Sequence, residues 1–242
     1  MTSRGLVVLV LLGLAILPVA CGWRTSSTSD VPAAVPEESG PSLFRDITAS
    51  SGIAFAYRNG AEAEHLSILE SLGGGAALLD FDGDDKRDIF LPGGGAFEGK
   101  EIRGRACKLY RNLGGGKFED ASDRLHIADG WFYNHGAAVG DYDRDGWPDL
   151  LLTGWDRLAL FHNEPVDAND AAKGRQFVDV ARQAGLTSRS WSSSAGWADF
   201  DGDGYPDLYV CCYVNWSFAN HPTCGRPRDI CPPKVFEGLP HK

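Results

Sequence analysis

The chain has 242 residues, 43% of them apolar, so it can bury a sizeable core in one or two domains. Its 30 glycines and 7 tryptophans, beside a single methionine, favour a β-rich fold with many tight turns over a helical bundle. The formal net charge of −10 argues against nucleic acid as a partner, because phosphate binding needs a basic face, but it leaves cations open.

Residues 1–20 predict an export signal. Arg4 supplies a positive start, and Leu6 to Leu17 is an uninterrupted apolar run. As a helix this run would span roughly 18 Å, which is too short for a hydrocarbon core of about 30 Å. Cys21 is placed as in a bacterial lipoprotein signal and would become lipid-modified, although Pro18 stands where leucine is usual. Ordinary secretion and an uncleaved membrane anchor are the alternatives.

Residues 21–42 predict a flexible tether, because they are rich in Ser, Thr, Pro and Ala and lack apolar periodicity. Such a segment would hold a domain off the membrane surface. The repeat region is expected to fill residues 43–242. It opens with LFRDIT at 43–48, which predicts a strand of the kind that completes the last blade of a closed propeller.

An internal repeat of about 60 residues follows the tether. Each copy has a short apolar run, an aspartate-rich loop and a second apolar run. The loops begin at Asp80, Asp141 and Asp199, so their spacing is nearly constant. The aligned segments are 75–93, 137–154 and 195–212.

Weaker strand candidates follow at 108–122, and at 159–164 with 176–181 across an insertion. Four short antiparallel strands per repeat are typical of a propeller blade. The predicted fold class is therefore all-β, a partial β-propeller of four-stranded antiparallel blades with about three blades present. The near-continuous apolar runs predict inner strands that are covered on both faces.

The aspartates of the loops at 80–88, 141–149 and 199–207 carry the chemistry. Carboxylates occupy positions 1, 3, 5 and 9 of each loop, and they repel one another unless a cation compensates them. Oxygen ligands at this density suit Ca²⁺ better than Mg²⁺, so about three structural Ca²⁺ sites are predicted. The expected ligands are Asp80, Asp82, Asp84, Asp88, Asp141, Asp143, Asp145, Asp149, Asp199, Asp201, Asp203 and Asp207.

The loops differ from an EF-hand, which shares the D-x-D-x-D start. That motif requires Glu at position 12 and helices on both sides. Position 12 is here Leu91, Leu152 or Val210, each inside an apolar run. Solvated Asp-Gly turns without metal are the other alternative, and three copies with the same four positions argue against it.

Backbone carbonyls near position 7 are expected to add a ligand in each loop, at Lys86, Trp147 and Tyr205. Glycines between the ligands are expected in left-handed backbone, at Gly83, Gly146, Gly202 and Gly204. The glycine runs 73–75, 93–95 and 114–116 are interpreted as turns, because none continues into the sequence of a phosphate loop.

Cys224 and Cys231 lie seven positions apart in a Pro- and Gly-rich loop. An oxidising compartment favours a local disulfide between them over two free thiols. Cys211 and Cys212 are adjacent on an expected strand, so their side chains point to opposite faces, and they are interpreted with Cys107 as packing residues. No pair has C-x-x-C spacing, which argues against zinc.

The loops DFDGDDKRD, DYDRDGWPD and DFDGDGYPD resemble the calcium-binding motifs of FG-GAP/VCBS repeats, known from integrin α-subunit propellers and bacterial surface proteins. With LYRNLGGGKFED and the tail CGRPRDICPPKVFEGLPHK, the chain is similar to the cartilage acidic protein family, whose bacterial members usually carry an ASPIC/UnbV-type region. The resemblance begins at about Leu43 and implies a seven-bladed propeller of about 400 residues or more. The chain is therefore expected to be a truncated member, and Asp85, where glycine is common, implies a weaker first site.

The predicted function is an extracytoplasmic calcium-binding repeat protein that acts as a protein or glycan interaction scaffold and is not an enzyme. It would lie in the periplasm or at the cell surface and touch the membrane only through a lipid at Cys21. A propeller-based polysaccharide hydrolase or lyase is one alternative, with Asn134 and His135 as its best candidates beside a simpler packing role. A carbohydrate-binding module using Trp131, Tyr133, Trp147 and Tyr205 is another.

Overall fold

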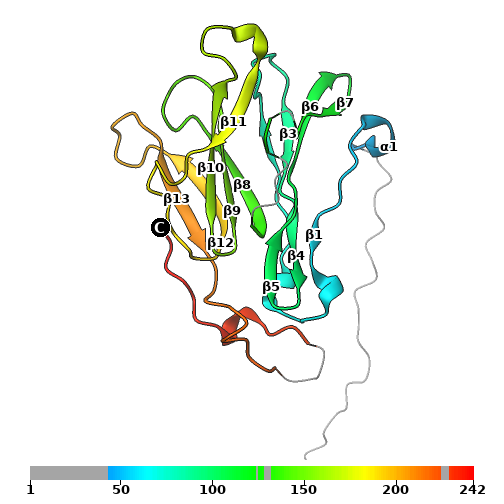
Figure 1. Cartoon of the computed structure of the whole chain (residues 1–242), viewed down its shortest axis with the longest axis vertical. Helices are drawn as coiled ribbons and strands as arrows, with labels where there is room; N and C mark the ends of the chain where they lie inside the picture. The colour runs from blue at the N-terminus through cyan, green and yellow to red at the C-terminus, as the bar shows by residue number, and fades with distance from the viewer. Residues whose placement is uncertain (1–42, 124, 128–131, 225–228) are drawn as a thin grey trace, which may run out of the picture. The chain divides into compact units, whose positions relative to one another are not determined.

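The computed structural model of the chain describes residues 43–123, 125–127, 132–224 and 229–242 (Figure 1). The predicted signal, the tether with Cys21, and Trp131 lie outside these residues. Residues from Asp46 to Lys242 form one compact unit. In the described part of the chain, no helix has the length and apolar character needed to cross a membrane.

The unit is nearly all β, as predicted. Its first four-stranded antiparallel sheet has the order β2 (Ala77–Leu79), β3 (Asp88–Leu91), β6 (Lys108–Gly114) and β7 (Lys117–Asp120). The second has the order β11 (Arg175–Asp179), β10 (Leu158–Pro165), β9 (Asp149–Gly154) and β8 (Asn134–Gly140). The third repeat contributes the antiparallel pair β12 (Ser192–Ala198) and β13 (Asp207–Cys212).

Helical structure within the described ranges is confined to short segments. The single α-helix there is α1 (Thr48–Ser51). The 3₁₀ turns are η1 (Ala61–Ala63), η2 (Ile68–Ser71), η3 (Ala171–Lys173) and η4 (Pro233–Val235). Each aspartate-rich loop therefore joins two strands, and the exclusion of an EF-hand is confirmed.

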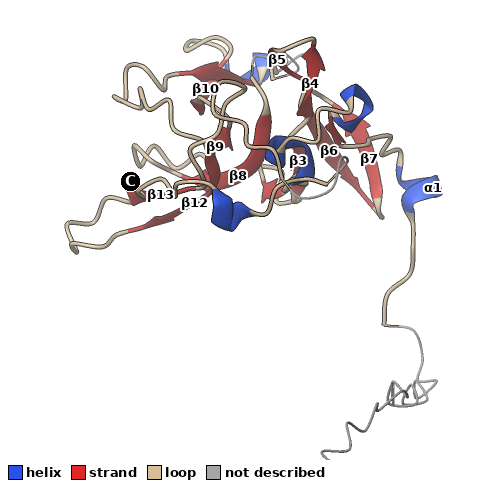
Figure 2. Ribbon diagram, turned by 90° about the horizontal axis from the view of Figure 1, so that it is seen from below, coloured by secondary structure: helices blue, strands red, loops and turns tan. Residues whose placement is uncertain are grey.

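The sheets stack face to face. The second sheet lies between the first sheet and the β12–β13 pair (Figures 1 and 2). One apolar cluster joins residues of the first two sheets, among them Leu79, Phe90, Leu150 and Phe161. Another joins Leu151 and Leu160 of the second sheet to Ala195 and Leu208 of the third. This stacking explains why all of β9, in the middle sheet, is buried. The prediction of an inner strand covered on both faces is confirmed there.

The aromatic residue at position 2 of each loop reports on this stacking. Phe81 is 2% exposed and packs toward Phe177 of the second sheet, with ring centroids 6.5 Å apart. Tyr142 packs in the cluster shared by the second and third sheets. Phe200 of the third loop is 67% exposed.

A hairpin that the repeat pattern does not predict interrupts the first sheet. β4 (Gly94–Glu98) and β5 (Glu101–Gly104) lie between β3 and β6 in the sequence and form a separate sheet with β1 (Arg58–Asn59). The interpretation of 93–95 as turn glycines is therefore wrong for Gly94 and Gly95, which are strand residues. A Cβ on Gly94 would lie 2.0 Å from the Arg58 carbonyl oxygen, so this close pairing requires glycine.

The predicted strand at 43–48 is also wrong. Residues 44–47 have no assigned secondary structure, and α1 starts at Thr48. The Asp46 carboxylate accepts a hydrogen bond from the Thr48 N–H at 2.8 Å, which curls the chain locally, and Gly52 in left-handed conformation ends the turn. An Asx turn thus replaces the extended backbone that the Phe-x-Asp pattern suggested.

Residues near the end of the described chain pair with β13. Val210 and Lys242 exchange two backbone hydrogen bonds, of 2.6 and 3.1 Å. The Cys212 N–H donates to His241 Nδ1 at 3.1 Å, and Val214 forms an isolated bridge with Gly238. This segment occupies the edge of β13 that β6 and β10 occupy on β3 and β9.

Candidate metal loops

The three aspartate loops share one hydrogen-bonded backbone. In each, the position 1 carboxylate accepts a bond from the N–H of position 6, at 2.9, 3.0 and 2.9 Å for Asp80, Asp141 and Asp199. The position 5 carboxylate accepts from the N–H of position 7 at 3.1, 2.9 and 2.8 Å in the same order. The repeat therefore fixes the geometry of the loop and not only its composition.

Position 9 anchors each loop to the sheet. Asp88, Asp149 and Asp207 accept hydrogen bonds from the N–H of position 2, at 3.1, 3.1 and 2.8 Å. Asp88 and Asp149 have no exposed surface, and this burial raises the pKa of both carboxyls.

Left-handed backbone recurs at positions 4 and 6. The predicted left-handed glycines are confirmed, with φ of 74° at Gly83, 89° at Gly146, 78° at Gly202 and 89° at Gly204. Where glycine is missing the backbone keeps the same conformation, with φ of 63° at Asp85 and 62° at Arg144. The loop shape therefore overrides the preference of individual residues.

Carboxylate oxygens converge in every loop, although not all four members in any one of them. Within each cluster the candidate ligand atoms lie no more than 4.8 Å apart. The clusters are Asp80 with Asp82 and Asp88, Asp141 with Asp143 and Asp149, Asp143 with Asp145 and His162, and Asp199 with Asp201 and Asp203.

The donor set fits a hard divalent cation. Oδ1 of Asp82 and Oδ1 of Asp141 are both buried and accept no hydrogen bond within the described part of the chain. A buried carboxylate oxygen without a donor is costly, and a bound cation would compensate it. Calcium takes six to eight such oxygens in flexible geometry.

Two side chains that the repeat analysis overlooked reach the loops from neighbouring strands. Arg111 of β6 donates from Nη2 to Asp84 at 3.0 Å and from Nε to Asp82. His162 of β10 has its Nδ1 3.1 Å from Asp149 Oδ1 and 3.7 Å from Asp143 Oδ2. The signal for both was their shared place in Leu-Tyr-Arg-Asn and Leu-Phe-His-Asn.

Comparison with known proteins identifies the same repeat region. The profile of FG-GAP-like repeats matches residues 80–152 and 141–210, more than half of the chain. This chain belongs to the FG-GAP-like repeat family. The match covers all three aspartate loops.

The curated relatives are integrin chains. Integrin alpha-7 of Rattus norvegicus is 28% identical over 148 residues, which are 59% of this chain and 13% of the relative. The chains of Mus musculus and Homo sapiens are each 29% identical, over 150 and 148 residues, with 12% of the relative covered. The chain thus spans about an eighth of the relatives it matches.

The aromatic residues considered for glycan binding have different environments. Tyr133 is fully buried, and its hydroxyl donates to the Asn59 carbonyl at 2.7 Å. Trp147 has the Arg175 guanidinium 3.7 Å from its ring centroid. Tyr205 is 54% exposed and lies beneath Arg144. Tyr133 is therefore a packing residue in this structure, whereas Trp147 is half-buried with Arg175 over its ring.

His135 is a core residue and not an exposed acid or base. It is 3% exposed and stacks on Trp191. The Trp191 indole N–H donates to Nε2 at 3.0 Å, so Nε2 is an acceptor, and the Tyr57 hydroxyl lies 3.2 Å from Nδ1. Burial lowers the pKa of His135 to about 4.

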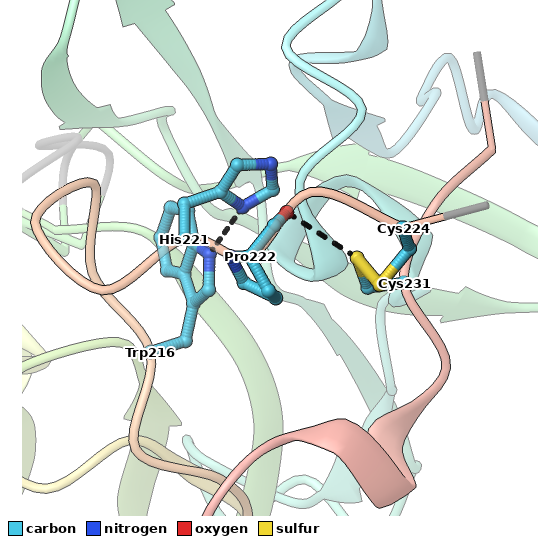
Figure 3. The surroundings of a disulfide bond; sticks show 5 residues. All are labelled: Trp216, His221, Pro222, Cys224 and Cys231. Atoms are coloured by element: carbon cyan, nitrogen blue, oxygen red, sulfur yellow. Dashed lines mark hydrogen bonds between the residues drawn. A yellow bond between two sulfur atoms is a disulfide. The ribbon is translucent and has the colours of Figure 1, made fainter. Parts of the chain in front are cut away.

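A disulfide joins Cys224 and Cys231, whose Cα atoms are 5.4 Å apart (Figure 3). Cys231 Sγ also lies 3.4 Å from the Pro222 carbonyl oxygen. Next to this bond, the Trp216 indole N–H donates to His221 Nδ1 at 3.0 Å. Cys107 and Cys212 are buried free cysteines, and Cys211 is half-buried.

Proposed function

We propose that this chain is an extracytoplasmic calcium-binding repeat protein whose propeller blades form an interaction scaffold. One observation carries the proposal: three loops with the same hydrogen-bonded backbone bring carboxylates together, and two of those carboxylates bury an oxygen that no donor in the described ranges reaches. The proposed Ca²⁺ ligands are the aspartates at positions 1, 3, 5 and 9. The ions would be structural, holding the loops that join the inner strands of each blade.

Binding is favoured over catalysis by the state of the candidate acid–base groups. His135 is buried with both ring nitrogens engaged. A surface groove of about 450 Å³ lies at the end of the second blade away from its aspartate loop. The two carboxylates that line this groove are both paired with arginines. These pairs are Asp156 with Arg189, and Asp179 with Arg157 at 2.6 Å. A catalytic carboxylate would need to be free to exchange a proton.

The extracytoplasmic location and the lipid anchor at Cys21 rest on the sequence from Met1 to Cys21. The disulfide between Cys224 and Cys231 supports an oxidising compartment. The proposed partner is a protein or a glycan, and the FG-GAP-like repeats shared with integrin alpha-7 chains support such a role.

Calorimetric titration of the full chain with CaCl₂ tests the proposal. We expect calcium uptake, and addition of a chelator should lower the melting temperature. An ion present at a hundred times its Kd contributes about 2.7 kcal/mol. For a chain of this size, one such site corresponds to roughly 5–10 °C.

Asp201→Asn should remove the uptake that belongs to the third loop, because Asp201 belongs to the cluster there. Asp167→Asn is the matched control: it removes a carboxylate of the same kind from an ion pair with Lys173, in the β10–β11 connection. A chain that takes up no calcium and melts at the same temperature with chelator would contradict the proposal.

A further inference from the structure

We propose that Arg111 is a built-in cation for the first loop, so that this loop keeps its shape without calcium and binds calcium more weakly than the other two. This inference rests on the proposed calcium binding. It gives a structural reason for the weaker first site that Asp85 implies in the sequence, and it also ranks the second and third loops.

The strand register places Arg111 beside its loop. In the first sheet Tyr110 pairs with Ile89, and in the second Phe161 pairs with Leu150. The next residue of each strand, Arg111 or His162, therefore reaches the same place in its blade.

The backbone on either side of this place is the same in both blades. The Asn112 N–H donates to Asp88 Oδ1 at 2.7 Å, and the Asn163 N–H donates to Asp149 Oδ1 at 2.9 Å. At this fixed point the two blades thus differ by one side chain, arginine in the first and histidine in the second.

In the first loop that side chain closes on two of the proposed ligands. The Arg111 guanidinium contacts Asp82 and Asp84, and the Lys86 ammonium lies 2.9 Å from Asp84. The Asp82 and Asp84 side chains are only 19% and 21% exposed, so water screens these pairs less than it would at an open surface. One carboxylate oxygen at each of positions 3 and 5 is therefore already paired, while Asp82 Oδ1 accepts no hydrogen bond within the described ranges and stays available to a cation.

The second loop has weaker compensation. His162 lies closest to Asp149, the anchoring carboxylate, and is 3.7 Å from Asp143. The nearest guanidinium belongs to Arg175, whose Nη2 is 4.0 Å from Asp145. Arg175 is also committed elsewhere, because it stacks on Trp147 and donates to Asn163 Oδ1 at 2.8 Å.

The third loop has no such ion pair. No Lys or Arg occurs in 199–207, and within the described ranges no salt bridge reaches Asp201 or Asp203. Arg144 of the second loop lies over the Tyr205 ring and not on a carboxylate. Calcium entering this loop meets carboxylates that accept only backbone hydrogen bonds within the described ranges, whereas calcium entering the first loop must displace Arg111. Affinity should therefore be highest in the third loop and lowest in the first.

A variant that leaves only the first loop intact tests the inference. Asp143→Asn and Asp201→Asn together remove a position 3 ligand from the second and third loops. Titrated with CaCl₂, this chain should bind far more weakly than the wild type. Adding Arg111→Gln should lower the Kd by at least about tenfold, because one positive charge no longer competes with the ion. Lys86→Gln in the same background should act in the same direction with a smaller effect.

Arg103→Gln is the matched control, since it removes a guanidinium that pairs with Glu98 and Glu101 on the β4–β5 hairpin. It should leave the Kd unchanged, and near-UV circular dichroism should show that every variant is folded. The inference is overturned if the first loop already binds as tightly as the others, or if neither Arg111→Gln nor Lys86→Gln strengthens binding. Wild-type protein that takes up no calcium would instead refute the proposed function.

Discussion

At the scale of single residues, polar side chains in this chain are often committed to structure where the sequence suggested chemistry. Asn134 and His135 begin β8, and both are buried. The Asn134 side chain accepts from the Gly94 N–H at 3.0 Å and donates to the Phe132 carbonyl at 2.8 Å. The aligned segment of this repeat begins at residue 137, so the pattern did not reach these residues. It also could not show that Tyr57 and Trp191, which are distant in the sequence, contact the two imidazole nitrogens of His135.

His135 should make stability depend on pH. Its pKa is about 4 when folded, against an ordinary value of 6.5, so the unfolded chain binds the proton more tightly. The contribution of His135 to the free energy of unfolding is therefore fully present above pH 6.5. It decreases by about 3 kcal/mol as the pH falls toward 4. Urea unfolding across this range should show the slope.

His135→Gln should flatten that slope, even if it lowers stability at neutral pH. His126→Gln is the control, because His126 is exposed, and it should leave the pH dependence as in the wild type. Equal slopes in His135→Gln and the wild type would assign the acid sensitivity to other groups.

At the scale of elements, the repeat pattern predicted the strands that are built from it. The apolar runs around each aspartate loop became the β2–β3, β8–β9 and β12–β13 hairpins. The β4–β5 hairpin escaped prediction because it occurs in one repeat only. The sequence signal for this hairpin was the length of the connection between the second and third strands of the blade. In the first blade β3 ends at Leu91 and β6 begins at Lys108, whereas in the second β9 ends at Gly154 and β10 begins at Leu158.

The contact between β1 and β4 should depend on Gly94. This residue has φ of 85°, and an added Cβ would meet the Arg58 carbonyl oxygen at 2.0 Å. Gly94→Ala therefore combines backbone strain with a clash and should lower the free energy of unfolding by about 2–4 kcal/mol. Urea denaturation provides the measurement.

Gly99→Ala separates these two effects. Gly99 also has positive φ, at 59°, but no atom lies within 4 Å of its added Cβ. Its loss should be limited to about 1–2 kcal/mol of backbone strain. If the two variants lose the same stability, close approach of β1 is not what requires Gly94.

At the scale of the whole unit, the sequence predicted the blades and their loops but not how each loop is compensated. Loop spacing is local information, whereas Arg111 and His162 reach the aspartates through pairing with strands that lie elsewhere in the sequence. The sequence pattern also does not show which blade faces are covered by a neighbouring sheet, as the third blade illustrates. Phe200 and Tyr209 are 67% and 45% exposed there, while Phe81 of the first loop is buried by the second sheet.

This face should promote self-association. Phe200, Tyr209 and half-buried Cys211 line an apolar surface over β12 and β13. Exposed apolar patches of this kind favour aggregation. The paired substitutions Phe200→Ser and Tyr209→Thr should raise the concentration at which light scattering first detects association, by at least about threefold.

Leu113→Ser is the control, since Leu113 is 51% exposed but lies on β6, away from this face. It should leave the association threshold unchanged. If Leu113→Ser shifts the threshold as much as the paired variant does, general surface hydrophobicity and not this face drives the association.

The position 2 aromatic has a consequence for how such chains lengthen. Phe81 packs against the following sheet, and Tyr142 does so in turn. The second repeat therefore carries both an aromatic residue that packs on the next sheet and a sheet face that receives the aromatic residue of the previous repeat. Tandem duplication of the encoding segment would then copy both halves of the interface together. An array of this kind can grow by whole units without inventing a new contact at each junction.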